Sequence, residues 1–495
     1  MAYAADSKGI IDYSQKPLIG KLDDDISVFS EIFTDDVTFV HRSFYCLSSP
    51  EVKCVVLYLD GMINTKTIND NIIEPVVQGN LMVSERLWDD IMSGTIRAND
   101  VKEKSDIGEL VKALLYGDAI ILLEGYAKGM IANAKGFATR SISEPDDEKS
   151  IRGPREGFTE ALMLNSSLIR RKIQTSDLKF KPKSFGARTS TRAFLCYLDS
   201  LVDKRILADL EKRLEMVQID GVLDANYIQE FIKDSPRSLF EMVGNTEKPD
   251  IAAAKILEGR IAIMLDGTPI VLTVPNLFVE NLQAADDYYT NFYYGSIGRI
   301  LRMSGFLLTI SAPALYVALI AFHPEMIPTS LMLSLARSIN QSPFPTVLEC
   351  IGMLIVFEVL RETGIRTPDK IGQALSVVGA LIVGQAAVEA RIVSAPVVIV
   401  VAFTGITGLM VPRMSGAVIA LRFALIVISA LLGFYGYLLG MVALLLYLGS
   451  LKSFGIDYTS QMYSADWSEM RDIYVRSPLT LMKDRPLFMS SDQKR

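Results

Sequence analysis

The stretch LRMSGFLLTISAPALYVALIAF, residues 301–322, is the first long apolar run in this chain of 495 residues. It has roughly the 20 apolar residues that a helix needs to cross a hydrocarbon core of ~30 Å. The preceding residues 1–295 carry most of the charge clusters and no apolar run of that length. The run therefore divides the chain into a soluble part and a membrane part.

More apolar runs follow, up to residue 451. Pro345–Leu360 is short and contains two glutamates, so a re-entrant segment is possible there. Ile371–Ala390 and Ser394–Pro412 are two further runs. Ala417–Ser450 is too long for one untilted span, so it is either two helices broken near Gly433–Gly440 or one long tilted helix. We expect five to six membrane segments.

Charge and composition exclude several classes of protein. The chain has 50 Lys and Arg against 57 Asp and Glu, a net charge of -7, and so lacks the basic excess of a nucleic-acid binder. None of its four cysteines forms a CxxC pair, and it has only two histidines. We expect no metal site, no cofactor and no enzymatic activity, because no nucleophile–base pair stands out.

The soluble part contains an internal similarity. CVVLYLDGMIN (54–64) resembles CYLDSLVD (196–203), and AIILLEG (119–125) resembles AIMLDG (262–267). Each run is typical of a buried strand that ends in an acidic turn, with a helical stretch after the first strand of each pair. Two related α/β subdomains are predicted; the alternative is two ordinary α/β units of similar composition.

The predicted fold is an α/β cytoplasmic N-terminal region of two related subdomains, followed by an all-α polytopic membrane domain. Arg299 and Arg302 flank the first apolar run, which favours a cytoplasmic soluble part with both termini on that side. The predicted boundaries are an N-terminal tail 1–35, a first subdomain 36–140, a linker with a helix 141–190, a second subdomain 191–298, a transmembrane domain 299–452 and a cytoplasmic tail 453–495.

Two soluble segments are candidates for coupling the parts of the chain. The linker contains Arg152, Gly153, Pro154 and Arg155, followed at 170–192 by eight Lys or Arg and one acid. That basic stretch is either a solvated face or a surface that docks on anionic lipid or an acidic partner.

The other segment precedes the membrane part. It is Asp286, Asp287, Tyr288 and Tyr289, and tyrosines favour the membrane interface. We expect an anchor and a coupling joint there.

Ionisable side chains inside the apolar runs are the strongest functional signal. Glu349, Glu358 and Glu389 would each cost about 3 kcal/mol if they faced lipid. Glu358 can pair with Arg361 three residues later, and Gln385 shares a helical face with Glu389. They are either structural pairs or the polar lining of an ion path, which several subunits would have to close.

Taken together, these motifs resemble the A subunit of GerA-type spore nutrient germinant receptors. The resemblance rests on RGPREGFTEALMLNSSLIRRKI (152–173), LEGRIAIMLDGTPIVLTVP (257–275) and DDYY (286–289). It continues through PFPTVLECIGMLIVFEVLRETGIRTP (343–368) and SVVGALIVGQAAVEARIVSAPVVIVVAFT (376–404) and covers about residues 35–455. The paralogous stage V sporulation protein AF type shares these motifs.

The resemblance implies a multi-pass protein of the spore inner membrane in an endospore-forming bacterium. It implies germinant receptor B and C subunits as partners, a homo-oligomer and contact with membrane lipid, but no nucleic acid. The implied function is to transduce germinant binding into germination, as an oligomeric ligand-gated cation channel. The alternatives are an accessory protein of the stage V type that acts in ion release, or a membrane scaffold for the other subunits.

Overall fold

The computed structural model describes residues 16–79, 81, 83–84, 86–136, 148, 152–366, 371–463 and 472–481. Within these residues the chain forms two compact units. The first unit runs to Pro236 and includes Val243–Pro275, and the second contains Arg237–Met242 and Asn276–Met482. Each unit is described separately below.

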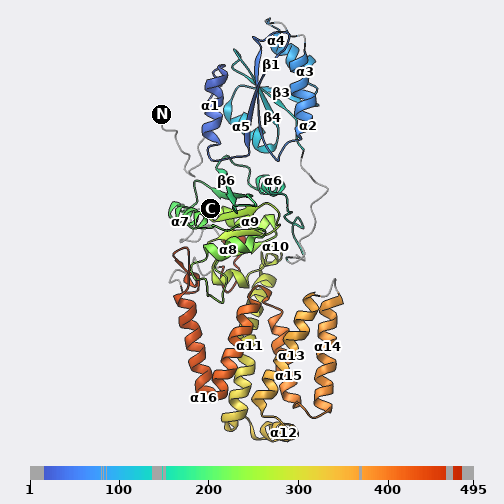
Figure 1. The fold of residues 1–495 in the computed structure, drawn as a ribbon, viewed down its shortest axis with the longest axis vertical. Coiled ribbons are helices and arrows are strands. Elements are labelled where there is room, and N and C mark those ends of the chain that lie inside the picture. The colour runs from blue at the N-terminus through green and yellow to red at the C-terminus, as the bar shows by residue number, and fades with distance from the viewer. Residues whose placement is uncertain are drawn as a thin grey trace. The chain divides into compact units, whose positions relative to one another are not determined.

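The first sheet of unit 1 has five strands that pair antiparallel in the order β1-β2-β4-β5-β3. Its central strands are almost continuously apolar because both faces are covered by helices (Figure 1). The strands are β1 (Phe39–Tyr45), β2 (Lys53–Leu59), β3 (Val101–Lys104), β4 (Ala119–Leu123) and β5 (Gly129–Ala132).

Alternate residues of the central strand β2 enter two different cores. Val55 and Leu57 pack with α1 and α5, whereas Cys54 and Val56 pack with the helical stretch after β2. This two-residue alternation is the geometry of a strand whose successive side chains point to opposite faces. The helices are α1 (Leu22–Ile32), α2 (Thr65–Ile68), α3 (Glu74–Gln78), α4 (Leu87–Asp89) and α5 (Ile107–Tyr116), with π-helical turns η1 (Asn69–Ile73) and η2 (Asp90–Thr95).

The second sheet of unit 1 repeats the first. Its antiparallel order is β6-β7-β9-β10-β8, the same order as in the first sheet when strands are counted from the start of each. The strands are β6 (Leu178–Phe185), β7 (Thr191–Leu198), β8 (Gly244–Thr246), β9 (Ile261–Leu265) and β10 (Val271–Val274), and the helices are α6 (Leu162–Lys172), α7 (Lys204–Glu215), α8 (Ala225–Ile232) and α9 (Pro249–Leu257).

The shared strand order confirms the prediction of two related α/β subdomains. The four similar segments of the sequence fall on equivalent strands, β2 with β7 and β4 with β9. Both Asp-Gly turns are turns in the structure, with positive φ at Gly61 and Gly267. Like composition alone does not produce the same order of five strands twice.

Two elements lie outside the predicted subdomain boundaries. Helix α1 falls in the segment 1–35 that was expected to be a tail, but Val28, Phe29 and Ile32 are buried in the core of the first subdomain. Strand β6 falls in the expected linker 141–190 and is an edge strand of the second sheet. The sequence does not reveal these two elements because each has only a short apolar face. Three aspartates in α1 and alternating lysines in β6 make both segments look polar.

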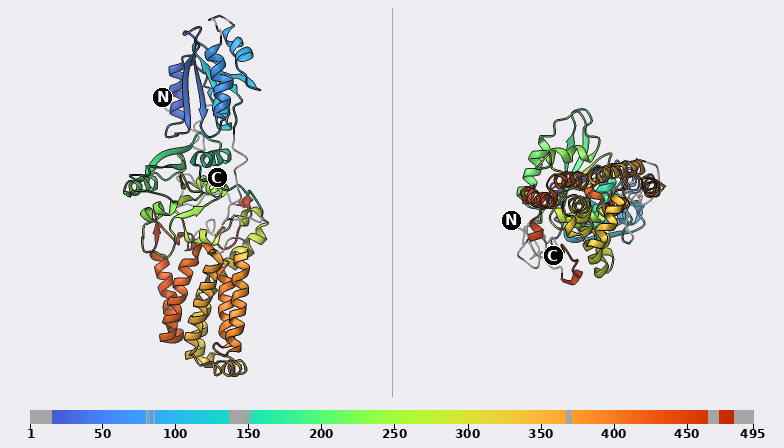
Figure 2. Two further views of the ribbon diagram at one scale, coloured as in Figure 1. Left: turned by 45° about the vertical axis from the view of Figure 1, so that its right-hand side comes forward. Right: turned by 90° about the horizontal axis from the view of Figure 1, so that it is seen from below.

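Unit 2 is helical. After η3 (Phe278–Leu282) and α10 (Asp286–Tyr289), its helices lie side by side, with α12 across one end (Figures 1 and 2). They are α11 (Phe292–Phe322), α12 (Thr329–Ile339), α13 (Thr346–Arg366), α14 (Ile371–Glu389), α15 (Ala395–Gly408) and α16 (Ser415–Ser450). Short 3₁₀ turns η4 (Pro324–Met326), η5 (Pro412–Met414), η6 (Ser460–Tyr463) and η7 (Leu479–Leu481) and the hairpin β11 (Lys452–Ser453)–β12 (Ile456–Asp457) complete the unit.

Two helical stretches of the described residues, Phe292–Phe322 and Pro412–Ser450, are long and apolar enough to cross a membrane. Val378–Glu389 and Ala395–Gly408 are shorter apolar helices. Between α12 and α14, α13 is one continuous helix of 21 residues, although it contains both glutamates that interrupt its apolar run. The number of segments that cross stays a prediction.

Helix α16 is broken at Gly433. Its φ of 62° and ψ of -144° are not helical, so two helices meet there rather than one long tilted helix. A Cβ at this position would lie 2.9 Å from the Cβ of Phe322, at the end of α11. Glycine is needed both for the backbone conformation and for the close approach of α11.

Candidate functional site: a charged network at the start of the first apolar helix

The candidate site is the junction of α10 and α11, where the chain enters its first long apolar helix. The Asn291 side chain caps α11 by accepting a hydrogen bond from the Tyr293 backbone N–H at 3.2 Å. One turn later, Gly295 lets α11 approach α10, since a Cβ there would lie 2.7 Å from the Asp287 carbonyl oxygen. The two helices are therefore held close together.

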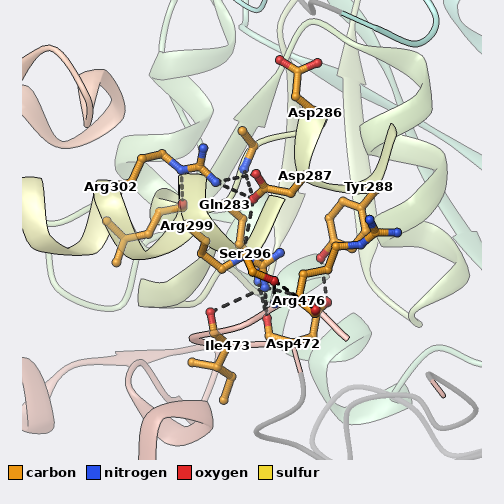
Figure 3. A network of polar contacts seen from close by, with 12 residues as sticks. Gln283, Asp286, Asp287, Tyr288, Ser296, Arg299, Arg302, Asp472, Ile473 and Arg476 are labelled. Carbon is orange, nitrogen blue, oxygen red and sulfur yellow. Dashed lines mark hydrogen bonds and ion pairs between the residues drawn. The ribbon is translucent and has the colours of Figure 1, made fainter. Parts of the chain in front are cut away.

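Asp287 is the centre of this junction (Figure 3). Its carboxylate is 3% exposed and accepts a hydrogen bond from Arg302 Nη2 at 2.6 Å and from Arg299 Nε at 3.4 Å. Arg302 Nε also donates to the Leu282 carbonyl at 2.7 Å. The buried carboxylate of α10 is thus paired with one buried and one half-buried arginine of α11, and removing it would leave positive charge without its nearest partner.

A segment from the far end of the sequence completes the network. Asp472 accepts hydrogen bonds from Arg299 Nη1 at 2.8 Å and from the Tyr288 hydroxyl at 2.7 Å. Its backbone carbonyl accepts from the Gln283 amide at 3.0 Å. The C-terminal segment is therefore fastened to the start of α11 by both its main chain and its side chain (Figure 3).

Four residues further on, Arg476 makes a second attachment. Its backbone N–H donates to the Ser296 hydroxyl at 3.1 Å, and its Nη1 donates to the Thr290 carbonyl at 2.9 Å. The Arg476 guanidinium also lies 5.7 Å from the centre of the Tyr288 ring, within the range of a cation–π contact. The side chain of Arg476 is 4% exposed, so this attachment is part of the folded core of the junction.

Only two of the four residues in the predicted DDYY segment take part in the network. Asp287 and Tyr288 lie in the network, whereas the Asp286 side chain points away from it and Tyr289 is exposed (Figure 3). The sequence pattern used Arg299 only to predict orientation and did not reveal its pairing. It also did not reveal Asp472, because nothing in a linear sequence brings residues 173 positions apart together.

The predicted linker contacts both sheets of unit 1 through the start of α6. Asp266 Oδ1, in the turn after β9, accepts a hydrogen bond from the Leu162 backbone N–H at 3.1 Å. In the turn after β2, a Cβ on Gly61 would lie 3.0 Å from the Met163 carbonyl oxygen. Helix α6 is therefore the element that the equivalent turns of the two subdomains share.

Upstream of α6, the four candidate coupling residues of the linker lie in unit 1 and outside the network of unit 2. Gly153 has a φ of 109°, which favours glycine, and Arg152 and Arg155 are exposed while Pro154 is half-buried. Further along, Glu156 pairs with Lys172 at 3.0 Å. The Arg140–Pro145 part of the linker lies outside the described residues.

The basic stretch 170–192 is neither a wholly solvated face nor a uniform docking surface. Arg170 Nη2 pairs with Asp36 Oδ2 at 2.5 Å, and both side chains are at most 1% exposed. Lys179 is buried and donates to the Ile32 carbonyl at 2.9 Å, and burial lowers the pKa of its ammonium. Both residues join the second subdomain to the segment that enters β1 of the first.

Glu349 in α13 is buried and holds the start of α15. Its Oε2 accepts hydrogen bonds from the Ser394 backbone N–H at 3.0 Å and the Ser394 hydroxyl at 2.6 Å. Because Ser394 precedes the first residue of α15, Glu349 supplies the capping acceptor that the serine itself does not. A carboxylate near a helix N-terminus is also favoured by the helix dipole.

Glu358 is paired with two arginines. Arg361 Nη2 lies 2.8 Å from Glu358 Oε2, as the three-residue spacing predicted. Arg422 of α16, which is 2% exposed, donates to Glu358 Oε1. The sequence pattern did not single out Arg422, although an arginine inside an apolar run signals a buried acidic partner. The trio carries one excess positive charge.

Gln385 and Glu389 differ from the other two glutamates, because both are exposed on α14 in the single chain. Among the described residues, no group of three or more His, Cys, Asp or Glu side chains could hold a metal ion. The four intramembrane candidates therefore fall into a helix cap, a salt-bridged group and an uncovered polar pair on α14.

Comparison with known proteins identifies the family. The family described as Bacillus/Clostridium GerA spore germination protein matches residues 27–488. Spore germination protein KA of Bacillus subtilis is 39% identical over 90% of this chain and 82% of its own. The uncharacterized membrane protein YfkQ of the same organism is 39% identical over 87% of this chain and 84% of its own.

A solved structure also matches. The N-terminal domain of the A subunit of the Bacillus megaterium spore germinant receptor GerK3 is 25% identical, covers 53% of this chain and 98% of that chain, and has a TM-score of 0.42. A family match over most of the chain, with relatives near 40% identity along most of their length, leaves one conclusion. The chain belongs to the GerA family of spore germination proteins.

Proposed function

We propose that this chain is the A subunit of a nutrient germinant receptor and that it transduces germinant binding into germination. Family membership supports the role. The observation that carries the mechanism is the buried network around Asp287. It fastens α10 to the start of the first long apolar helix, α11, through ion pairs.

In this mechanism α10 and α11 move together. Asp287 and Arg299 are buried and Arg302 is half-buried, so separating these ion pairs would leave charge uncompensated inside the protein. A displacement of α10 is therefore transmitted to α11 rather than absorbed. Asp472 and Arg476 attach the C-terminal segment to the start of α11. In the proposed mechanism this segment either moves together with α11 or detaches from it when α11 moves.

The proposed output is a cation path that opens between copies of this chain. Glu358 is a poor candidate for its lining, because two arginines surround it and their excess charge repels cations. Gln385 and Glu389 support a lining by α14, since they are exposed in the single chain and would be costly against lipid. A neighbouring copy that faces them across water removes that cost.

The proposed setting is the spore inner membrane, as a multi-pass and non-enzymatic protein. Receptor B and C subunits are the proposed partners, with the B subunit recognising the germinant. The Glu349, Glu358 and Arg422 side chains are held inside unit 2 by neighbouring polypeptide, which is what a chain surrounded by lipid requires.

The coupling step is tested with Asp287→Asn in spores that carry the other receptor subunits. We expect the variant chain to accumulate in the membrane fraction at the wild-type level. Spores that carry it should release far less K⁺ after germinant addition than wild-type spores do. Asp286→Asn is the matched control, because the Asp286 carboxylate, next to Asp287 in the chain, points away from the network. Normal K⁺ release by Asp287→Asn, at wild-type protein level, would contradict the coupling mechanism.

The cation path is tested separately, by ion flux from the reconstituted chain with its B and C partners. Glu389→Gln is expected to lower cation flux or its selectivity over anions. Glu362→Gln is the control, since this exposed glutamate on α13 pairs with Arg366 of the same helix. If Glu389→Gln and the wild type conduct identically, α14 does not line the path.

A further inference from the structure

We propose that α12 is an interfacial helix, which lies in the plane of the bilayer surface with its apolar face against the acyl chains. The inference rests on the proposed membrane location of unit 2 and goes beyond it. It assigns lipid as the partner of a surface that the mechanism above leaves unused.

Length excludes a membrane span for α12. Its 11 residues rise about 16 Å at 1.5 Å per residue, roughly half of the ~30 Å hydrocarbon core. None of these residues, all of which the structure describes, is buried. The helix therefore neither crosses the bilayer nor forms part of the protein interior.

The sequence of α12 has two faces. Leu331, Leu335 and Ile339 follow one another at four-residue spacing and share one face with Met332. The other face carries polar side chains, Ser330, Ser334 and Arg337. Arg337 is the only charged residue of the helix. A short amphipathic helix with no acidic residue suits the boundary between acyl chains and phosphate headgroups.

Position in unit 2 agrees with that surface. The helix lies across the ends of the neighbouring helices (Figures 1 and 2). It connects the C-terminal end of α11, one of the stretches long enough to cross a membrane, to the start of α13. The end of a membrane-spanning helix lies at the bilayer interface by its length, so a segment that begins a few residues after the end of α11 lies there too.

Exposed apolar side chains extend the surface on both sides of the helix. On the apolar face Leu331 is 52% exposed, and Met332, Leu335 and Ile339 are half-buried. Met326 before the helix and Phe344 after it are 57% and 50% exposed. In water, these exposed apolar side chains would keep an unfavourable contact with solvent. Lipid covers Leu331, Met326 and Phe344 together, because these residues belong to one segment between the ends of α11 and α13.

The helix is connected to the inside of unit 2. Helix α12 contacts α15, and just after it the Ser342 hydroxyl donates to the Ile392 carbonyl at 3.0 Å. Ile392 is two residues before Ser394, whose N–H and hydroxyl donate to Glu349. The depth of α12 in the bilayer surface is thereby linked to the start of α15.

The test is spin-label accessibility on the full chain reconstituted in phosphatidylglycerol-containing vesicles. Single cysteines replace residues of the apolar face, in Leu331→Cys and Leu335→Cys, and of the polar face, in Ser330→Cys and Arg337→Cys. The chain's own four cysteines are buried, and the labelled wild type measures their background. Val442→Cys, on an exposed site of α16, reports whether unit 2 is in the bilayer.

We expect the ratio of oxygen to aqueous nickel accessibility at Leu331→Cys and Leu335→Cys to be several-fold higher than at Ser330→Cys and Arg337→Cys. Equal ratios on the two faces would place α12 in water and overturn the inference. Exclusion of both reagents from the apolar face would mean that a second copy or a different protein covers it, which also overturns it. A Val442→Cys label in water would instead refute the membrane location itself.

Discussion

Asp266 caps helix α6 from a turn 104 residues further along the chain, because its Oδ1 accepts the Leu162 backbone N–H at 3.1 Å. The residue before the helix, Ala161, has no side chain that could do this. The start of α6 is therefore stabilised by the turn after β9 of the second sheet. The Asp266–Gly267 turn therefore does more than reverse the chain after β9, because its aspartate also caps α6.

Replacing that carboxylate should destabilise unit 1. We expect Asp266→Ala to lower the free energy of unfolding by about 1 kcal/mol, the usual cost of losing an N-terminal helix cap. Asp266→Asn should retain most of the stability, since an amide oxygen also accepts the bond. Asp60→Ala is the control, because the Asp60 carboxylate accepts from its own turn at Gly61. Urea unfolding followed by circular dichroism distinguishes them, and equal losses would refute the cap.

The buried pair of Asp36 and Arg170 should be strongly coupled. Asp36→Asn leaves the Arg170 guanidinium buried without a counter-charge and is expected to cost about 3–5 kcal/mol. Arg170→Met should cost a similar amount for the opposite reason. The double variant should recover much of the loss, which a double-mutant cycle in urea measures. Additive losses would show that the two charges do not interact.

The ion pair of Arg422 and Glu358 should also stabilise unit 2, but its two side chains should contribute unequally. Arg422→Met removes the deeper of the two arginines and leaves Glu358 with Arg361. Glu358→Gln leaves two buried or half-buried arginines without their acid. We expect Glu358→Gln to lower the thermal midpoint in detergent more than Arg422→Met does. The reverse order would show that the positive excess of the trio is balanced by another group.

Gly433 should be irreplaceable within α16. An alanine there must adopt a backbone conformation that costs about 1–3 kcal/mol and must also displace Phe322. Gly449→Ala is the matched control in the same helix, because a Cβ at that position has nothing within 4 Å. We expect Gly433→Ala to reduce the yield of monodisperse protein in detergent and Gly449→Ala to leave it unchanged. Equal yields would mean that the break does not depend on glycine.

Alkaline pH should weaken unit 1 through Cys54. Burial raises the pKa of this thiol from 9.0 to about 12, so it keeps its proton in the folded chain while the unfolded chain loses it. The stabilisation is complete below pH 9 and is lost as the pH rises toward about 12. At pH 10 the loss is about 1.4 kcal/mol. In urea unfolding at pH 8 and 10, Cys54→Ala should lose less stability than the wild type, and an identical loss would refute the assignment.

Much of the fold follows from local patterns. The apolar runs around Cys54 and Ile263 become central strands because continuous apolar residues of strand length suit a sheet with both faces covered. The break at Gly433 was one of two possibilities in the sequence. The DDYY segment was predicted to be a coupling joint, but the sequence could not separate Asp287 from Asp286, since only the direction of each side chain distinguishes them.

The sequence by itself determined the division into a charge-rich and an apolar part, the duplicated strands and the family, because periodicity and motif are properties of neighbouring residues. Only the tertiary structure decided the partners of the buried charges. Arg299 meets Asp287 and Asp472, Asp36 meets Arg170, and Glu358 meets Arg422, and most of these partners lie at separations that no local pattern encodes. The reason is physical: a charge taken out of water needs an opposite charge beside it, and folding alone determines which one is within reach.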